Sequence, residues 1–302
     1  MEDHQIRIAT FDWLDQQNKI FGDVLPRDIL SEGFSYFGQR ITLVGPQGIW
    51  KPAIMGLPIS ITTVVGGPYD DSLSEDGLLV YKYRGTDPYH RDNVGLREVM
   101  RRRIPLIYFL GIEKGKYIAE WPVFIVYDHL DKLEFSINIE EKNSGVIKNM
   151  KNNEALISEA SASYLRGYFT TQAVVRLHQR AFRARVLMAY KEQCAFCRLR
   201  HQQLLDAAHI IPDREQGGDP VIPNGLSLCK IHHAAFDNYF VTVTPEFKII
   251  VREDILKESD GPMLRYGIQQ MHEQKIILPG NKKHWPDRDR LEERFKRFRE
   301  IS

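Results

Sequence analysis

The sequence has little cysteine. Its 302 residues contain three cysteines, Cys194, Cys197 and Cys229, and these lie in one short stretch that also holds four of the ten histidines. Three thiols cannot pair completely into disulfides, which excludes a disulfide framework. In a reducing compartment, clustered cysteines more often bind a metal ion. The clustering of the few cysteines therefore makes this stretch the candidate metal-binding segment.

The chain also lacks a long apolar run and an excess of charge. No apolar run approaches the ~20 residues of a membrane span. The N-terminus, MEDHQIRIATFDW, lacks the basic start and apolar core of a signal peptide. The formal net charge is +1, so a nucleic-acid surface must be a local patch. These features predict a cytoplasmic protein without membrane contact.

The chain length allows two domains. Residues 15–140 contain short β-branched and aromatic runs separated by Gly and Pro, which predict a β-barrel or sandwich. NVGLREVMRRR interrupts them as a predicted helix. Residues 140–155 are polar and are the best linker candidate. We expect a first domain at 1–145, a linker and helix at 146–172, and a second domain at 173–302.

The second domain is expected to begin with a basic helix. TTQAVVRLHQRAFRARVLMAY has apolar residues near a period of 3.6, and no acidic residue lies between 171 and 191. Its basic faces are either solvated or laid along phosphates, which makes Arg180 and Arg183 candidate DNA contacts. YFVTVTPEFKIIV predicts a hairpin. A terminal helix is expected to pack through Leu291, Phe295 and Phe298.

Two short pairs can chelate one metal ion. Cys194-x2-Cys197 and Cys229-x2-His232 offer three thiolates and one imidazole, the tetrahedral donor set that Zn²⁺ prefers. The sequence therefore predicts a structural zinc site. The stretch between the pairs is longer than in a simple zinc ribbon, so we expect the insert to contain the function.

The insert reads as strand, loop, strand and helix. LLDAAHIIPD predicts a strand that presents His209, GGDP a loop, and NGLSLC a second strand that leads into a short helix. In this order, C-x2-C, AHIIP, NGLSLC and HHAAFD resemble the HNH endonuclease family, in its branch with a zinc-stapled ββα-metal fold. The resemblance covers residues 174–255.

The resemblance implies roles for three residues. His209 is the expected general base, a task suited to an imidazole whose pKa is near neutrality. Asn224 is expected to hold the catalytic loop or to lie near the metal. His233 is expected to ligate a catalytic divalent cation, Mg²⁺ or Mn²⁺. Neighbouring helical positions point about 100° apart, so His232 can face the zinc and His233 the DNA.

The sequence departs from the family at Ala208. Many members place Asp or His there as a second ligand of the catalytic metal. Either the metal has fewer protein ligands here or another group replaces the missing one. The candidates are Asp206, Asp213 and Asp237.

The first half resembles another family. GGPYDD at 66–71, Asp76-Gly77, Tyr83-Arg84-Gly85, Asn93 and Leu96 follow the pattern of SRA (YDG) domains, and the resemblance covers residues 18–130. SRA domains are PUA-like β-barrels that flip a modified cytosine out of duplex DNA. Rival interpretations are another PUA-like barrel or an unrelated β domain.

Base flipping needs aromatic faces and polar groups that read a base edge. The expected pocket loop contains Gln47 as an edge reader and Trp50 as a stacking ring, although Trp50 is equally well interpreted as a core aromatic. Tyr69, Asp70 and Asp71 are further pocket candidates that could instead only shape a turn. The chain has Trp-Lys-Pro where the family usually has a small residue followed by His-Gly-Arg.

Together these features predict an α+β protein. We expect an N-terminal SRA-like (PUA-like) β-barrel and a C-terminal ββα-metal HNH domain with structural zinc and flanking helices. The two resemblances imply a prokaryotic, type IV/IIM-like restriction endonuclease in phage defence that cuts double-stranded DNA carrying 5-methyl or 5-hydroxymethyl cytosine. Double-strand cleavage then needs a homodimer or two binding events. The alternatives are an HNH nuclease that senses another ligand and a non-catalytic, zinc-scaffolded DNA-binding protein.

Overall fold

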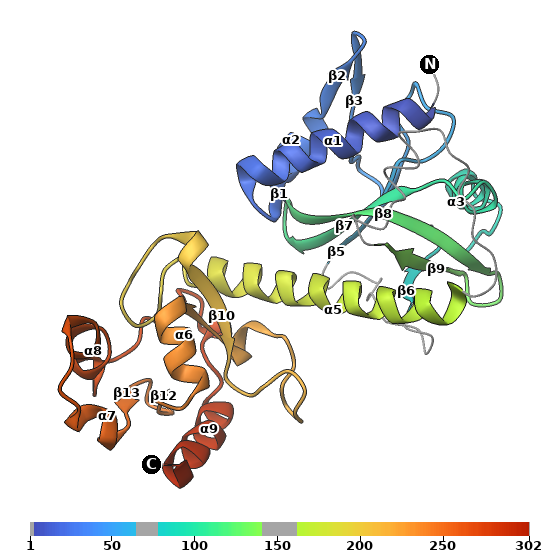
Figure 1. The fold of residues 1–302 in the computed structure, drawn as a ribbon. Coiled ribbons are helices and arrows are strands. Elements are labelled where there is room, and N and C mark those ends of the chain that lie inside the picture. The colour runs from blue at the N-terminus through green and yellow to red at the C-terminus, as the bar shows by residue number, and fades with distance from the viewer. Residues whose placement is uncertain (1–2, 65–77, 141–161, 302) are drawn as a thin grey trace. The chain divides into compact units, whose positions relative to one another are not determined.

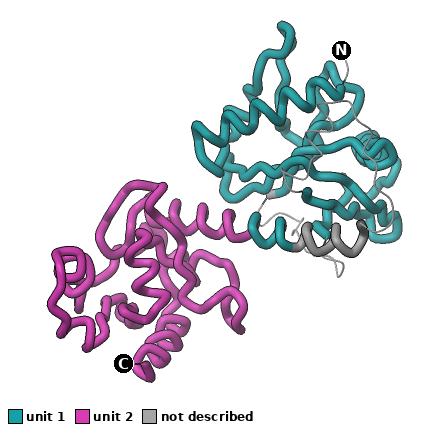
Figure 2. Tube along the Cα trace, viewed as in Figure 1, with its two compact units in different colours: residues 1–177 teal, residues 178–302 magenta. Residues whose placement is uncertain are grey.

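The computed structural model of the chain describes residues 3–64, 78–140 and 162–301. The chain divides into two compact units, unit 1 at residues 1–177 and unit 2 at residues 178–302 (Figure 2). The division falls inside helix α5 (Ala162–Ala189). Most of the expected linker lies outside the described residues, so the domain limits at 145 and 172 stay a prediction.

A curled sheet forms the body of unit 1 (Figure 1). Its strands run in the order β4-β5-β7-β8-β9-β6, with β1 added to β8, and they curve into a half-barrel. Among the described strands of this sheet, β5 and β7 pair in parallel and the other pairs are antiparallel. The strands are β1 (Val24–Pro26), β4 (Ile49–Trp50), β5 (Ser60–Val64), β6 (Leu79–Lys82), β7 (Leu106–Glu113), β8 (Lys116–His129) and β9 (Glu134–Ile139). An α+β fold is confirmed, and an SRA barrel stays a prediction.

Helices and a small hairpin surround this sheet. They are α1 (Asp3–Phe21), α2 (Arg27–Glu32), α3 (Arg91–Arg101) and the hairpin of β2 (Phe34–Tyr36) with β3 (Gln39–Ile41). Helix α3 is the predicted NVGLREVMRRR helix. Helix α1 was not predicted from the sequence, and its buried face includes Arg7 and Thr10. The Nη atoms of Arg7 donate inside the unit to the carbonyl oxygens of Pro58 at 2.6 Å and Pro105 at 3.0 Å.

Unit 2 contains the predicted strand, strand and helix in succession. Strand β10 (Leu205–His209) pairs antiparallel with β11 (Gly225–Cys229), and α6 (Lys230–Asp237) follows directly. The predicted hairpin is β12 (Val241–Val243) with β13 (Ile249–Val251). Further helices are α7 (Glu253–Lys257), α8 (Pro262–Gly267) and α9 (Arg288–Ile301), and four short 3-10 turns lie at Gln202–Leu204, Ile222–Asn224, Gln269–Met271 and Lys282–His284.

Helix α5 packs directly on β11. Phe182 and Val186 belong to the core of unit 2, as their helical spacing predicts. A Cβ atom at Gly225 would lie 2.5 Å from Val186 Cγ2 and 2.9 Å from the Phe182 ring, so only glycine allows this approach. The close contact fixes the strand that leads from Asn224 to Cys229.

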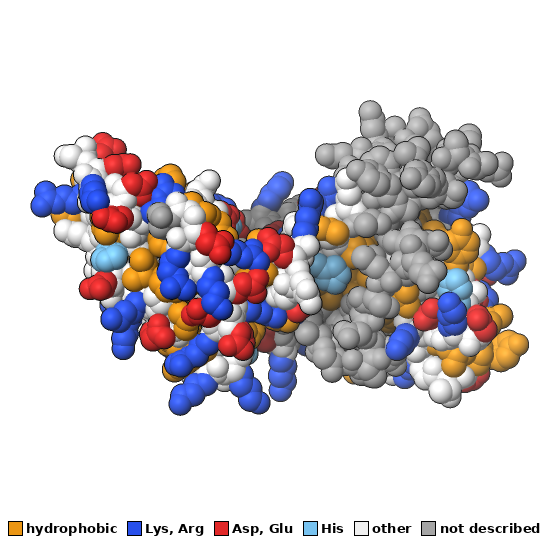
Figure 3. Space-filling view, turned by 90° about the horizontal axis from the view of Figure 1, so that it is seen from below, with side chains coloured by type: hydrophobic (Ala, Val, Ile, Leu, Met, Phe, Trp, Pro, Cys, Tyr) orange, Lys and Arg blue, Asp and Glu red, His pale blue; other side chains and the backbone are white. Residues whose placement is uncertain are grey.

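Two further features of the structure are the hydropathy of its helices and its surface charge. No helix among residues 3–64, 78–140 and 162–301 is long and apolar enough to cross a membrane. On the left of Figure 3, where few side chains are grey, basic and acidic side chains are interspersed.

Candidate active site

The first cluster of unit 2 brings together three cysteines and one histidine. One ligand atom from each of Cys194, Cys197, Cys229 and His232 lies within 4.8 Å of all the others. His232 Nδ1 is 3.4 Å from Cys194 Sγ and 3.2 Å from Cys229 Sγ, and Cys197 Sγ is 3.9 Å from Cys229 Sγ. Ligands of a tetrahedral Zn²⁺ ion lie about 3.5–3.8 Å apart. The four predicted ligands therefore fit a tetrahedral metal ion.

The surroundings of His232 also suit a metal ligand. Its Nε2 atom lies 2.6 Å from the Gly267 carbonyl oxygen, so Nε2 carries the proton and Nδ1 is left to face the sulfur atoms. Such a hydrogen bond to the outer nitrogen fixes the tautomer and orientation of metal-binding histidines. The contact also joins α8 to the cluster, which makes the fold of this segment depend on the metal site.

His209 ends β10, where its ring stacks on Phe182 with a centroid separation of 4.1 Å. Nε2 is buried and has no hydrogen-bond partner among the described residues. Burial lowers the pKa of His209, and the carboxylates of Asp213 and Asp237 oppose that shift. A neutral imidazole with an unsatisfied nitrogen is suited to accept a proton from water.

Asn224 holds the loop that follows His209. Its side chain is fully buried and accepts a hydrogen bond from the Ile211 N–H at 2.9 Å. Its amide group donates to the carbonyl oxygens of Ile211 at 3.0 Å and Asp219 at 3.1 Å. The geometry is that of a loop anchor, one of the two roles considered for Asn224 from the sequence.

His233 lies on α6 between two carboxylates. Its Nε2 atom is 3.2 Å from Asp237 Oδ2, one helical turn away, and its Nδ1 atom is 3.8 Å from Asp206 Oδ2. Hydrogen bonding to Asp237 raises the pKa of His233. Ala208 is fully buried in the core of unit 2, so no metal ligand comes from that position.

Arg183 and Arg185 on α5 have partners within unit 2. Arg183 donates to the carbonyl oxygens of Gln202 and Leu205, both at 2.9 Å, and lies 3.5 Å from Asp206. These contacts tie α5 to the start of β10. Arg180 is half-buried. The expected DNA contacts of Arg180 and Arg183 stay a prediction.

Arg294 is a residue that the sequence reasoning missed. It is 3% exposed and donates to the carbonyl oxygens of Ile210, at 3.2 Å, and of Phe236. Its guanidinium group lies 3.6 Å from the Phe236 ring centre. Burial lowers its pKa to about 10. Arg294 thus joins the residue after His209 to the residue before Asp237.

The predicted packing stripe of α9 needs correction for the same reason. Leu291 and Phe298 are buried, whereas Phe295 is only half-buried. The intervening core position belongs to Arg294, because the carbonyl oxygens and aromatic rings beneath it satisfy a cation. Arg294 lies three residues after Leu291 and four before Phe298, on the same helix face, but no motif distinguishes it in the sequence from a surface arginine.

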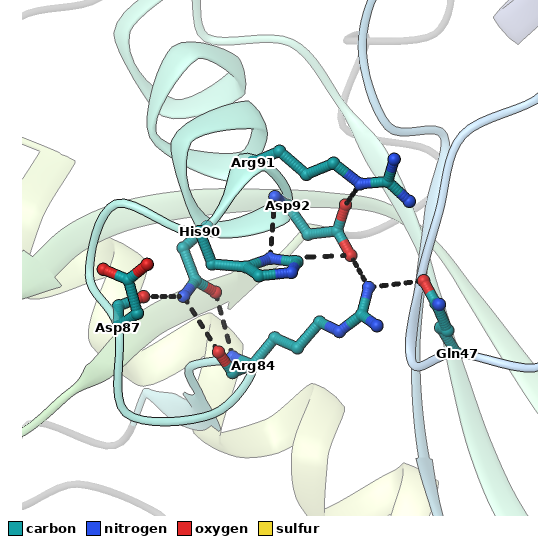
Figure 4. A network of polar contacts seen from close by, with 7 residues as sticks. Gln47, Arg84, Asp87, His90, Arg91 and Asp92 are labelled. Atoms are coloured by element: carbon teal, nitrogen blue, oxygen red, sulfur yellow. Dashed lines mark hydrogen bonds and ion pairs between the residues drawn. The ribbon is translucent and has the colours of Figure 1, made fainter.

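The structure brings together two of the five pocket residues expected in unit 1. Gln47 and Trp50 line a common cavity with Arg91 and Asp92 of α3. Arg84 links Gln47 to Asp92 in the network of Figure 4. Tyr69, Asp70 and Asp71 lie outside the described residues, so their predicted role in a pocket is not tested.

Comparisons with known proteins identify the class of the C-terminal unit. Residues 194–244 match the family model HNH_2, described as HNH endonuclease. Unit 2 therefore contains an HNH endonuclease domain, and this prediction from the sequence is confirmed.

Solved structures extend the comparison to more of the chain. The chain is similar to "Modification dependent TagI restriction endonuclease", with 17% identity, a TM-score of 0.29, and coverage of 83% of this chain and 85% of that one. It is also similar to "Structure of the Type IV phosphorothioation-dependent restriction endonuclease ScoMcrA", with 15% identity, a TM-score of 0.22, and coverage of 60% and 46%. No curated protein matches the chain.

Proposed function

We propose that this protein is a modification-dependent DNA endonuclease in which unit 2 hydrolyses the phosphodiester bond and unit 1 reads a modified cytosine by base flipping. The observation that carries the nuclease activity is the ββα arrangement of His209, Asn224 and His233 within a matched HNH domain. The charges of Asp237 and His233 act on the pKa of His209, which supports one shared site for the proposed base and the proposed metal-binding groups.

The residues divide the reaction between them. His209, held neutral by burial, takes a proton from the water molecule that attacks phosphorus. Asn224 keeps the loop after His209 in place. His233 and Asp237 would hold a divalent cation, which would supply Lewis-acid stabilisation of the developing charge at phosphorus and at the leaving 3′ oxygen. Cys194, Cys197, Cys229 and His232 would hold Zn²⁺, which would serve the fold and not the chemistry.

Among the three carboxylates considered, Asp237 is the best second ligand for the catalytic cation. It faces Nε2 of His233 at 3.2 Å and is half exposed. Asp206 is held by Lys230 at 2.8 Å and lies on the Nδ1 side of His233. At 3.8 Å from Nδ1, Asp206 acts on His233 through its charge and not through a hydrogen bond. Asp213 acts on the charge of His209.

Unit 1 is proposed to supply the choice of target. The half-barrel and its cavity with Gln47 and Trp50 support a base-reading role, and 5-methyl or 5-hydroxymethyl cytosine is the proposed target. One HNH site cuts one strand, so double-strand cleavage is proposed to need a homodimer or two successive events. The proposed setting is type IV/IIM-like restriction of phage DNA in a prokaryotic cytoplasm.

A plasmid digestion tests the proposal. The wild-type protein is incubated, with Mg²⁺ or Mn²⁺, with unmodified, 5-methylcytosine, 5-hydroxymethylcytosine and phosphorothioate plasmids. Cleavage of a cytosine-modified plasmid in preference to the others is expected. His209→Ala should reduce that rate by about 10²- to 10⁴-fold, since general-base catalysis contributes this much. His201→Ala, an exposed histidine of the same unit, is the matched control and should cut normally.

Each other outcome removes a defined part of the proposal. Equal cleavage of all plasmids would remove modification reading and leave the nuclease. Preference for phosphorothioate DNA would replace cytosine by a backbone modification. Binding without cleavage by the wild-type protein would leave a zinc-scaffolded DNA-binding protein.

A further inference from the structure

Unit 1 contains a cavity of about 300 Å³, which lies within the size range of small-ligand sites. It is separate from the HNH site, which belongs to unit 2. Residues from three segments line it, namely Gln47, Ile49, Trp50, Lys51, Gly56, Pro58, Arg91, Asp92 and Gly95. The cavity combines one aromatic ring with several charged and polar side chains.

The aromatic wall is fixed and offers no polar atom. Trp50 Nε1 donates to the carbonyl oxygen of Thr42 at 3.0 Å and lies 3.1 Å from its hydroxyl oxygen. The ring lies against Gly45, where a Cβ atom would approach to 2.0 Å. Because the one donor of the indole is used inside the unit, Trp50 presents only its carbon surface to the cavity. Such a surface suits a flat apolar face.

The orientation of the Gln47 amide group is also fixed. Arg84 donates to Gln47 Oε1 and, with the same nitrogen, to the carboxylate of Asp92 (Figure 4). A guanidinium group has only donors, so the amide oxygen of Gln47 must face Arg84. Gln47 Nε2 makes no hydrogen bond within the described part of the chain. The two N–H groups of Gln47 Nε2 are therefore the part of this side chain that can donate to a ligand.

Two further side chains of the cavity, Lys51 and Arg91, also donate. Lys51 Nζ uses one of its three N–H groups on the carbonyl oxygen of Met55, at 2.8 Å. Arg91 is 80% exposed, and its Nε atom lies 3.4 Å from Asp92. The Asp92 carboxylate is thus shared by Arg84 and Arg91. Because Asp92 is the one acidic residue among the described lining residues and its carboxylate is occupied, the polar part of this lining offers donors and positive charge.

We propose that this cavity binds a group that presents only hydrogen-bond acceptors, and that Asp92, acting through Arg84, is a positioning residue that turns the donor end of Gln47 toward it. This rests on the proposed function, because the ligand is taken from DNA. Two parts of DNA have the required chemistry: the O2 and N3 edge of a flipped cytosine and the oxygen atoms of a phosphate. An exocyclic amino group is excluded as the partner of Gln47, since both would donate.

Exchange of the donor for an acceptor tests the proposal. Gln47→Glu keeps the size of the side chain and its partner Arg84 but replaces the N–H groups by an oxygen atom. In the His209→Ala background, where DNA stays intact, Gln47→Glu should weaken binding of the preferred duplex about 10-fold or more, measured by fluorescence anisotropy. Gln39→Glu makes the same change at an exposed position of the same unit and should leave the affinity unchanged.

Two DNA analogues distinguish the sources of the acceptor. An abasic site at the modified position removes the base and keeps the phosphates. A methylphosphonate linkage there keeps the base and removes the phosphate charge. If the difference between Gln47→Glu and the wild-type residue disappears with the abasic duplex, the ligand is the base edge. If it disappears with the methylphosphonate duplex, the ligand is the phosphate.

The positioning role of Asp92 is tested by comparing KM with kcat, because a loss of fold stability alone would not change KM selectively. In an otherwise wild-type protein, Asp92→Asn should raise KM for the preferred duplex and leave kcat unchanged, because it releases Gln47 without touching unit 2. Asp92→Glu, which keeps the charge, should restore part of the affinity. Equal changes in kcat and KM, or no rescue by glutamate, would contradict a positioning role.

The outcomes separate this inference from the nuclease assignment. Equal binding by Gln47→Glu and Gln39→Glu overturns the inference, whereas metal-dependent cleavage by the wild-type protein continues to support the nuclease. Weaker binding by Gln47→Glu alone supports the inference even if the wild-type protein cuts every plasmid equally. A wild-type protein that binds no DNA overturns both.

Discussion

The two units contain the same structural device. Asn93 in unit 1 and Asn224 in unit 2 are both fully buried. Asn93 accepts from the Arg84 N–H at 2.9 Å and donates to the carbonyl oxygens of Arg84 at 3.1 Å and Asp87 at 2.8 Å. Asn224 makes the corresponding three bonds with Ile211 and Asp219. Each asparagine side chain therefore supplies hydrogen-bond partners to the backbone groups of one loop.

The two loops differ in what they carry. In unit 2 the held residue, Ile211, follows His209 by two positions, so the anchor and the reactive group belong to one short motif. In unit 1 the held residue is Arg84, which reaches Gln47, 37 positions away in the sequence. Unit 2 builds its chemistry from neighbours in sequence, and unit 1 builds its cavity from segments that only the fold brings together. This difference leads to the following predictions.

The largest effect is expected from a zinc ligand. Cys229→Ser should lose the metal and unfold unit 2, since structural zinc supplies about 10–16 kcal/mol of apparent binding energy. The half-barrel of unit 1 should stay folded, because it has its own core. Zinc content by elemental analysis and hydrogen exchange of the full chain, resolved by peptide, measure both.

Chelation of the wild-type protein is the control for this variant and should give the same exchange pattern. A Cys229→Ser protein that retains one zinc ion per chain and protects β10 and β11 from exchange would contradict the zinc assignment. Loss of protection in both units together would contradict the independence of unit 1.

Unit 2 was the more predictable region from sequence because its constraints are local. The spacing of Cys194-x2-Cys197 and Cys229-x2-His232 is typical of metal ligands, so the spacing itself predicts the four-residue cluster. His232 and His233 are adjacent residues on one turn of α6, so their different directions were also predictable from the sequence. Arg294 was not predictable, because its partner Ile210 is 84 positions away and no motif requires it.

Unit 1 was less predictable because its polar residues are satisfied at long range. Helix α1 was missed since a buried arginine interrupts its apolar face, and the carbonyl groups that satisfy Arg7 lie 51 and 98 positions away. The strands were predictable in kind from β-branched and aromatic runs. The parallel pairing of β5 with β7 was not, because no local signal fixes which strands become neighbours.

Matched substitutions of the two asparagines are expected to have the second-largest effect. Asn224→Ala and Asn93→Ala each remove three hydrogen bonds of a buried amide group and should each cost about 2–4 kcal/mol of local stability. Asn224→Ala should also lower cleavage about 100-fold, because displacement of His209 by an ångström misaligns the base. Asn93→Ala should raise Kd for the preferred duplex and leave kcat intact.

Hydrogen exchange of the two loops and steady-state cleavage provide the measurement. Each variant is the control for the other, because each should change the exchange of its own unit only. Loss of cleavage in Asn93→Ala at saturating DNA would show that the loop of Arg84 serves catalysis and not target choice. Unchanged cleavage in Asn224→Ala would remove the asparagine from the site.

The smallest effect is expected on the acid limb of the pH profile of cleavage, the low-pH range in which the rate falls. The rate needs a neutral His209, so it falls as the pH drops through the pKa of this imidazole. Burial holds that pKa below the ordinary value of about 6.5, and the Asp213 carboxylate raises it. Asp213→Asn removes a charge that favours the imidazolium. The acid limb of kcat/KM should therefore move to lower pH, by less than about one unit.

Asp219→Asn is the matched control on the same loop. Its carboxylate pairs with Arg290 at 3.2 Å, and it does not act on the charge of His209. The acid limb should then stay where the wild-type protein has it, with both variants measured first at the Mg²⁺ concentration that saturates the wild-type protein. A lower plateau rate in Asp213→Asn that additional Mg²⁺ restores would make Asp213, and not Asp237, the second ligand of the catalytic cation. Unit 2 would then recruit that ligand from the loop anchored by Asn224, and its site would depend on a held loop as the cavity of unit 1 does.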